Sequence, residues 1–166
     1  MLEEVILVDE NDSPKGTMEK MEAHRKGALH RAFSIFLFNS KGEMLLQQRA
    51  FAKYHSGGLF SNACCSHPRP GEDTLAAAHR RLKEEMGIET ELHYKTSFVY
   101  RTTFDNGLTE HEFDHVFTGV SDDEPALNPF EVASYKWLNM EEMRDEMEQH
   151  PGRFSYWFRM AMEKLF

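Results

Sequence analysis

Short runs rich in apolar residues, bounded by turn-forming residues, recur along the chain, which is consistent with β-strands. Three such runs lie in the first fifty residues, at 3–10 (EEVILVDE), 32–38 (AFSIFLF) and 43–49 (EMLLQQR). The last two are joined by NSKG, in which Asn39 and Gly42 can adopt the positive φ of a hairpin turn. We therefore expect a hairpin there, an edge strand at 3–10, and a turn at the following NDSPKG.

The second half of the chain adds three more strand-like runs. Residues 91–104 and 111–120 flank the turn DNG, and residues 133–139 (ASYKWLN) form a shorter run. Mostly antiparallel strands with few helices between them predict an α+β fold, with mixed or antiparallel β-sheets sandwiched by helices.

Helical patterns are fewer and lie between or after these runs. The clearest covers residues 71–88, where Asp73 or Thr74 can cap the start and Gly87 can end the helix. Two further helices are expected, at 140–150 (rich in Met and polar residues) and at 153–166 (amphipathic).

The length and charge of the chain narrow the class of protein. Its 166 residues suit one domain with one core, which we predict to span residues 1–166. The formal net charge of -9, without a basic stripe, argues against a nucleic-acid partner. The apolar run at 32–38 is too short to span a bilayer, so no membrane partner is expected.

Two adjacent cysteines and the lack of a secretory pattern at the start indicate a reducing cytoplasm. The oligomeric state stays open.

The charges of the segment 71–88 follow the spacing E-x7-R-x3-E-E-x-G-I. The residues are Glu72, Arg80, Glu84, Glu85, Gly87 and Ile88. A single pair such as Arg80 and Glu84, at i,i+4, is typical of a solvated helix with salt bridges. The whole spacing resembles the Nudix box, in which glutamates bind divalent ions that hold a diphosphate. Two positions depart from that box: Ser66 stands in place of a glycine and Arg81 in place of a glutamate. The lost carboxylate weakens the interpretation as a hydrolase.

Both cysteines of the chain lie in one stretch, SNACCSHP, together with a histidine. Residues i and i+2 of a strand face the same side, so Cys65 and His67 would share a face and Cys64 would face the other. Cys64 is then expected to be a small buried hydrophobe. The same alternation puts Glu110 and Glu112 of TEHEF side by side.

Two more histidines, His24 and His30, precede the core run at 32–38. A lone histidine before a strand is more often exposed, and a Glu-x-Glu pair is more often an exposed edge. Taken together, however, three imidazoles and two carboxylates form a plausible octahedral site for Mn, Zn, Fe or Mg.

These motifs, in this order, resemble type I isopentenyl diphosphate isomerase, a family with the Nudix fold. The resemblance covers nearly the whole chain, through GTMEKMEAH, LHRAFSIFLFN, QQRAFAK, SNACCSHP, the altered Nudix box, TEHEFDHVF, SYKWL and FSYWF. The Cys-x-His-Pro corner with the Glu-x-Glu strand is specific to this family within the fold. Phe60 and Ala63 depart from it, because a tryptophan and a hydroxyl residue are common there.

The resemblance implies roles for individual residues. The protein metal site, for one transition-type ion (Mn²⁺ or Zn²⁺), is matched by His24, His30, His67, Glu110 and Glu112. Glu85 matches the ligand of a Mg²⁺ ion that also holds the substrate diphosphate. Cations that face the phosphates are matched by Lys20, Arg49, Lys53 and Arg81. Aromatic residues at the hydrocarbon end are matched by Tyr100 and Trp157.

The activity implied by the resemblance moves a double bond by adding one proton and removing another. Cys65 matches the catalytic thiol, Glu112 lies on a different strand, and either could deliver the first proton. Trp157 could stabilise the carbocation through its π face. Two other functions compete with this one: a Nudix hydrolase of a nucleoside diphosphate derivative, and an inactive Nudix module that binds a phosphorylated ligand or a protein.

Overall fold

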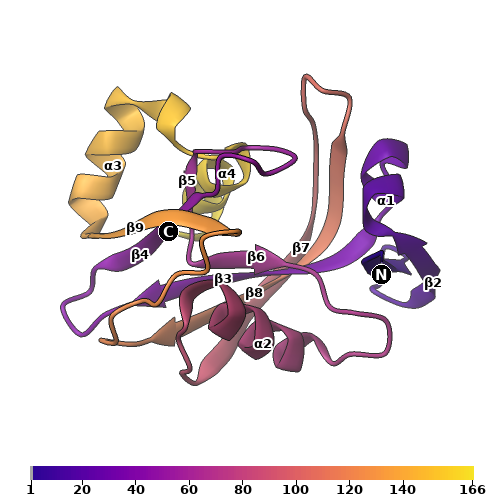
Figure 1. The fold of residues 1–166 in the computed structure, drawn as a ribbon, viewed down its shortest axis with the longest axis horizontal. Helices are drawn as coiled ribbons and strands as arrows, with labels where there is room; N and C mark the ends of the chain where they lie inside the picture. The colour runs from indigo at the N-terminus through magenta and orange to yellow at the C-terminus, as the bar shows by residue number, and fades with distance from the viewer. Residues whose placement is uncertain (1) are drawn as a thin grey trace.

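The computed structural model describes residues 2–166, and it has the α+β architecture that the sequence predicts. Within these residues the strands form one mixed nine-stranded sheet (Figure 1). The central strand is β3 (His30–Phe38). Its partners are β1 (Glu4–Val8), β4 (Met44–Arg49), β6 (Cys64–Ser66) and β8 (Thr109–Val120). The remaining strands are β2 (Pro14–Glu19), β5 (Phe60–Ser61), β7 (Leu92–Thr103) and β9 (Val132–Leu138).

The N-terminal strand is not at the edge of the sheet, so that prediction was wrong. β1 lies between β2 and β3, and β2 forms the edge over residues that we expected to form a turn. An edge strand tolerates Pro14 because its missing N–H leaves no ladder bond unmade toward a further strand. The reversal itself is confined to residues 9–13, where Asp12 has a φ of 63°.

The predicted hairpin between β3 and β4 has the expected turn, but the strands diverge at once. They share a single registered pair, Phe38 with Met44, and β4 then runs antiparallel to β9. β3 instead runs parallel to β8 in a register that extends from His30 opposite Glu112 to Phe38 opposite Val120. This parallel pair sits in the middle of an otherwise antiparallel sheet, and its register determines the site described below.

Three of the four α-helices within residues 2–166 follow the predicted segments. α2 (Thr74–Met86) is capped by Asp73 and ends at Gly87. α3 (Met140–Gln149) begins with a capping box. α4 (Tyr156–Leu165) starts later than expected, because residues Pro151–Arg153 form a separate 3₁₀ turn.

A short helix, α1 (Lys20–Lys26), was not predicted. It ends at Gly27, which has a φ of 67°, and leads directly into β3. His24 on this helix is fully buried, which overturns the simple expectation that a histidine before a strand is exposed.

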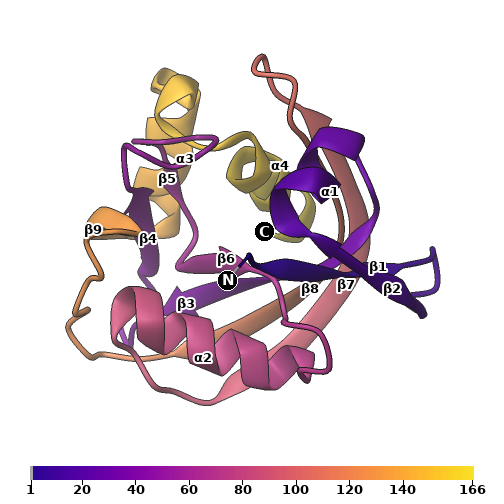
Figure 2. The ribbon, with the colours of Figure 1, turned by 45° about the vertical axis from the view of Figure 1, so that its right-hand side comes forward.

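The sheet is covered on its two faces by different helices (Figure 2). Phe33, Ile35 and Leu37 of β3 face α2 in one core cluster. Phe36 faces the opposite side, where it packs with Phe158 of α4. No helix within residues 2–166 combines the length and apolar character needed to cross a bilayer.

Candidate active site

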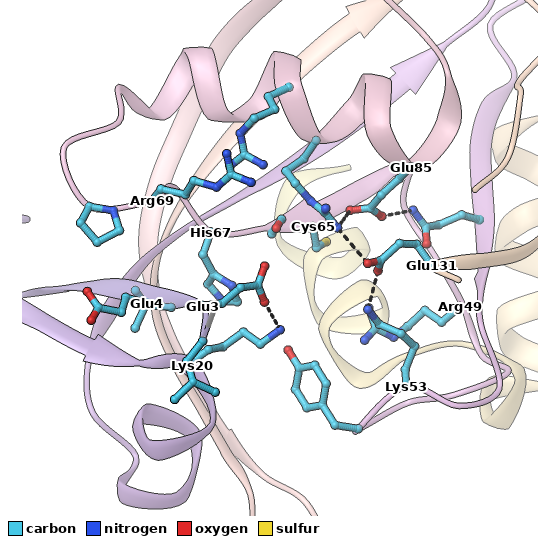
Figure 3. Close-up of a pocket in the computed structure, with 18 residues that line it drawn as sticks. Glu3, Glu4, Lys20, Arg49, Lys53, Cys65, His67, Arg69, Glu85 and Glu131 are labelled. Carbon is cyan, nitrogen blue, oxygen red and sulfur yellow. Dashed lines mark hydrogen bonds and ion pairs between the residues drawn. The ribbon is translucent and has the colours of Figure 1, made fainter. Parts of the chain in front are cut away.

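A cavity of about 670 Å³ opens beside β6, between α2, α1 and the loop that follows β4 (Figure 3). Basic side chains line it: Lys20, Arg49, Lys53, Arg69, Arg80 and Arg81. These include all four cations that the resemblance assigned to phosphate contacts. Cys65, His67 and Glu85 line the same cavity. Clustered cations in a cavity are the electrostatic signature of an anion site.

Two of these cations are held by carboxylates that the sequence did not point to. Lys20 Nζ lies 2.5 Å from Glu3 Oε2, and Lys53 Nζ lies 2.5 Å from Glu131 Oε2 (Figure 3). Arg49 forms no ion pair within the described chain, and it donates to the carbonyl of His55. These ion pairs hold the two lysine ammonium groups in the lining of the cavity.

Glu85 and Arg81 are bound to each other rather than pointing freely into the cavity. Arg81 Nη2 donates to Glu85 Oε2 at 2.9 Å, and Arg81 Nη1 donates to Glu84 at 2.7 Å. The other oxygen of Glu85 accepts from Gln47 Nε2 at 3.1 Å. Glu85 is only 4% exposed. A Mg²⁺ ion at Glu85 would therefore have to share this carboxylate with Arg81.

Three predicted metal ligands, His24, His30 and His67, come together although they are far apart in sequence. One donor atom from each lies within 4.8 Å of the others. Nδ1 of His24 bonds the carbonyl of Lys20 at 2.7 Å, and Nδ1 of His30 bonds that of Ala28 at 2.8 Å. A carbonyl can only accept, so both Nδ1 atoms carry the proton and both Nε2 atoms keep a lone pair.

The protonation state of these histidines suits metal binding. Nε2 of His24 and of His30 is buried and has no hydrogen-bond partner among residues 2–166. Burial lowers the pKa of His30 to about 4. Burial, and then the neighbouring His30 and His24, hold the pKa of His67 well below its usual value. Buried neutral imidazoles with unused lone pairs fit a divalent cation, because metal ligation requires the neutral form.

Glu110 and Glu112 lie beside this cluster, as strand alternation predicts. Glu112 Oε2 is 3.6 Å from His67 Nε2, and Glu110 forms a second close group with His24 and His55. Burial, then the Glu110 and Asp114 carboxyls, raise the pKa of Glu112. For Glu110, burial acts upward but is outweighed by His55, and the pKa falls to about 2. The structure thus brings all five predicted ligands together.

A second, smaller cavity of about 30 Å³ adjoins the first and shares Arg49 and Cys65 with it. Its lining also includes Glu110, Glu112 and Trp157. Both predicted catalytic side chains, Cys65 and Glu112, therefore face one small space. Arg49 and Cys65 border both this space and the cation-lined cavity.

Cys65 is held by a buried polar network. Its thiol donates to Asn62 Oδ1 at 3.2 Å, and the same oxygen accepts from Trp157 Nε1 at 3.2 Å. Ser34 Oγ lies 3.4 Å from Cys65 Sγ and donates to Asp114 Oδ2 at 3.1 Å. Burial raises the pKa of the Cys65 thiol, which therefore keeps its proton.

Cys64 faces the other side of β6, as predicted. It is fully buried in the α2 core cluster, with Ala77 and Leu82. Tyr100 does not line either cavity. It packs edge-on against Trp157, with ring centroids 5.1 Å apart, and lies opposite Glu112 in the β7–β8 register. Tyr100 thus supports the wall of the site from behind Trp157.

Several residues of the site were missed by the sequence reasoning: Glu3, Ser34, Gln47, Tyr54, His55, Asn62, Asp114 and Glu131. A signal existed for some of them. Gln47 precedes Arg49 by two strand positions, Asn62 lies within SNACCSHP, and His55 follows QQRAFAK by two residues. Glu3 and Glu131 gave no signal, because only the tertiary fold brings them to Lys20 and Lys53.

The NUDIX domain family matches residues 28–158. The chain is 55% identical to the isopentenyl-diphosphate Delta-isomerase of Pectobacterium atrosepticum over 99% of this chain and 92% of the relative. It is 52% identical to isopentenyl-diphosphate Delta-isomerase 2 of Aromatoleum aromaticum, over 99% of this chain and 87% of the relative.

Similar solved structures share the fold at lower identity. The DR0079 protein of Deinococcus radiodurans superposes with a TM-score of 0.74 at 24% identity, covering 89% of this chain and 90% of that one. The MutT protein of Methanosarcina mazei superposes with a TM-score of 0.67 at 20% identity, over 82% and 91%. These two likenesses establish the Nudix fold, and the full-length identities above establish the family within it. The chain belongs to the type I isopentenyl-diphosphate Delta-isomerase family of Nudix-domain proteins.

Proposed function

We propose that this protein interconverts isopentenyl diphosphate and dimethylallyl diphosphate, a step of isoprenoid biosynthesis. The observation that carries the proposal is the pair of adjoining cavities. One is large and lined with cations, and the other is small and contains a thiol, a carboxyl and an indole ring. A substrate with a diphosphate at one end and a short alkene at the other has the matching distribution of charge.

The diphosphate end is assigned to the large cavity. Lys20, Arg49 and Lys53 supply positive charge there, and Arg81 adds more from α2. A Mg²⁺ ion that enters with the substrate diphosphate would use Glu85, since carboxylate and phosphate oxygens are the ligands that Mg²⁺ prefers. The Mg²⁺ charge would also replace that of Arg81 beside Glu85, so that Arg81 could turn toward the phosphates.

The proton transfers are assigned to Cys65 and Glu112. Isomerisation adds a proton to the terminal CH₂ carbon of the alkene, which gives a tertiary carbocation. Loss of a proton from the carbon next to the oxygen-bearing carbon then forms the new double bond, with no net change in atoms. One group must therefore start protonated and the other unprotonated, and the two exchange roles in the reverse reaction. Glu112 is buried and Cys65 is half-buried, so little water can surround the alkene between them.

The cationic intermediate needs a site that stabilises charge and excludes water. Trp157 faces the small cavity and is fixed by its bond to Asn62 and its stacking on Phe98. A cation over a desolvated indole face gains about 2 kcal/mol. The small cavity has room for about one water-sized group, so five carbons require its side chains to move apart.

A transition-type ion, Mn²⁺ or Zn²⁺, fits the neighbouring donors of His24, His30, His67 and Glu110, with Glu112 beside His67. When bound, such an ion supplies positive charge that favours the ionised form of Glu112. We also propose that the protein acts in the cytoplasm on a small diphosphate substrate. A reduced Cys65 thiol is needed for the reaction, and free thiols persist in reducing compartments.

Incubation with isopentenyl diphosphate, Mg²⁺ and Mn²⁺, followed by product analysis, tests the proposal. Dimethylallyl diphosphate as the product supports it. Release of inorganic phosphate would instead favour a Nudix hydrolase, and absence of any turnover by folded, metal-loaded protein would favour a binding module. Arg81 disfavours the hydrolase, because it neutralises the carboxylates Glu84 and Glu85 of the Nudix box.

A further inference from the structure

His55 belongs to the loop between β4 and β5, outside the five residues assigned to the metal site. Its side chain is only 8% exposed. The ring stacks on Phe104 with centroids 4.7 Å apart and planes inclined by 9°, and it meets Tyr54 edge-on at 4.5 Å. The β7–β8 hairpin and its own loop thus fix the imidazole in one orientation.

The free edge of this ring points at the metal site. His55 Nε2 lies 3.3 Å from Glu110 Oε2, but no hydrogen bond satisfies this buried nitrogen within residues 2–166. Nδ1 lies 3.3 Å from Ser56 Oγ, and this hydroxyl can accept a hydrogen bond from a protonated Nδ1. His55 therefore resembles His24 and His30, which also bond through Nδ1 and leave Nε2 without a partner.

His55 also lies within reach of the same ion. Donor atoms of His24, His55 and Glu110 lie within 4.8 Å of one another, and His24 belongs equally to the group with His30 and His67. Two donors on opposite sides of an ion with bonds of about 2.1 Å are about 4.2 Å apart. Small side-chain movements would bring both groups onto one ion next to His24.

We propose that His55 is a sixth protein ligand of the transition-type ion, binding through Nε2. This inference rests on the metal site of the proposed function and extends it from five donors to six. Six protein donors fill an octahedral set and leave no position for water or substrate, which is typical of a site that acts through charge. The ion would then also fix the loop that carries Lys53 and Tyr54 into the diphosphate cavity.

The competing explanation is that His55 only positions Glu110 by a hydrogen bond and does not bind the ion. The two explanations predict different effects when His55 is replaced by glutamine. A glutamine can donate a hydrogen bond to Glu110, so it would restore a positioning role. An amide is a poor ligand for these ions compared with an imidazole, so it would not restore a ligand.

The test is Mn²⁺ affinity of the full-length protein, measured by competition with a chelating dye. We expect His55→Ala and His55→Gln both to bind Mn²⁺ at least about tenfold more weakly than wild type. His93→Ala, at an exposed histidine, should bind as wild type does. His67→Ala should lose affinity because it belongs to the five-residue site.

Two results would overturn the inference: unchanged affinity in His55→Ala, or recovery of wild-type affinity in His55→Gln. If His67→Ala also bound normally, the proposed metal site itself would be wrong, which separates the two failures.

A measurement on wild type avoids any folding defect in the variants. In ¹⁵N-histidine spectra, saturation with Zn²⁺ should shift the Nε2 resonances of four histidines, and a shift of only three that leaves out His55 would contradict the inference.

Discussion

Cys64 and Cys65 are neighbours in the chain with the same side chain, but they lie in different surroundings. Cys65 faces the small cavity and the Asn62 network, whereas Cys64 packs in the core under α2. Strand alternation alone separates them, and the antiparallel pairing of Ser34 with Cys65 fixes which one faces the site.

Replacement of each cysteine by alanine should therefore have a different effect. Cys65→Ala should lower kcat by orders of magnitude with little change in stability, because it removes a proton-transfer group. Cys64→Ala should retain most activity and cost about 1 kcal/mol of unfolding free energy through packing. Steady-state kinetics and urea unfolding measure the two effects. The opposite pattern would mean that the register of β6 is wrong.

Asn62 is a residue whose importance the sequence did not reveal. Its Oδ1 holds both the Cys65 thiol and the Trp157 indole, while its Nδ2 donates to the carbonyls of Ile35 and Cys64. Asn62→Ala should reduce kcat about 10–100-fold by releasing two groups of the site. It should also cost about 1–3 kcal/mol, since buried polar groups lose their partners.

The control for Asn62→Ala is Asn11→Ala, a substitution of the same kind at an exposed turn position. Kinetics and denaturation of both proteins should separate a specific effect from a general one. Equal kcat in Asn62→Ala and wild type would show that the amide does not position Cys65 or Trp157.

At the level of elements, the site depends on the parallel register of β3 and β8. That register sets His30 opposite Glu112, and α1 brings His24 to the same end of the sheet. The longer strands β1, β3, β4, β7, β8 and β9 were predictable from their hydrophobic pattern, and so was α2 with its caps, whereas β2 begins in a segment expected to be a turn. The β3–β8 pairing was not, because it joins segments about eighty residues apart and no local feature encodes it.

Failures of sequence prediction at the N-terminal end have a local cause. α1 has only seven residues, and its polar composition gives no amphipathic pattern long enough to recognise. Strand alternation paired Glu110 with Glu112 and residue type suggested a metal set, and the resemblance then assigned all five ligands to one site. The carboxylates Glu3 and Glu131, which pair with the cavity lysines, and His55 depend on contacts between distant loops.

The end of α2 gives a test of the fold at this scale. Gly87 has a φ of 65°, and a Cβ there would lie 2.7 Å from Cβ of Ala126. Gly42 has a φ of 78°, but a Cβ added there would meet no atom within 4 Å. Gly42→Ala should cost about 1 kcal/mol from backbone strain alone. Gly87→Ala should cost at least about 1 kcal/mol more, because of overpacking. Urea unfolding of the two variants checks this, and equal losses would argue against the packing of residue 126 on the helix end.

For the molecule as a whole, metal binding should be linked to stability. The proposed ligands from α1, β3, β8 and the segment after β6 lie close together, so an ion bound by them would tie these elements together. A ligand that binds only the folded protein, at a free concentration of one hundred times its Kd, adds about 2.7 kcal/mol to the unfolding free energy. For a chain of this size that corresponds to a rise in Tm of roughly 5–10 °C.

We therefore expect Mn²⁺ to raise the Tm of wild type and of His93→Ala, and a chelator to reverse the rise. His67→Ala should show little response. Thermal unfolding curves recorded by circular dichroism, with and without Mn²⁺, measure the change in Tm. A full response in His67→Ala would place the stabilising ion elsewhere in the molecule.

The large cavity is expected to hold the diphosphate while side chains of the small cavity add one proton to the alkene and remove a different proton. Proton NMR of isopentenyl diphosphate incubated with the metal-loaded protein in D₂O tests this directly. We predict dimethylallyl diphosphate with deuterium in the newly formed methyl group, and its loss in Cys65→Ala. Release of phosphate with the alkene unchanged, or recovery of undeuterated isopentenyl diphosphate alone from active-site-intact, metal-loaded protein, would show that the cavities do not carry out this reaction.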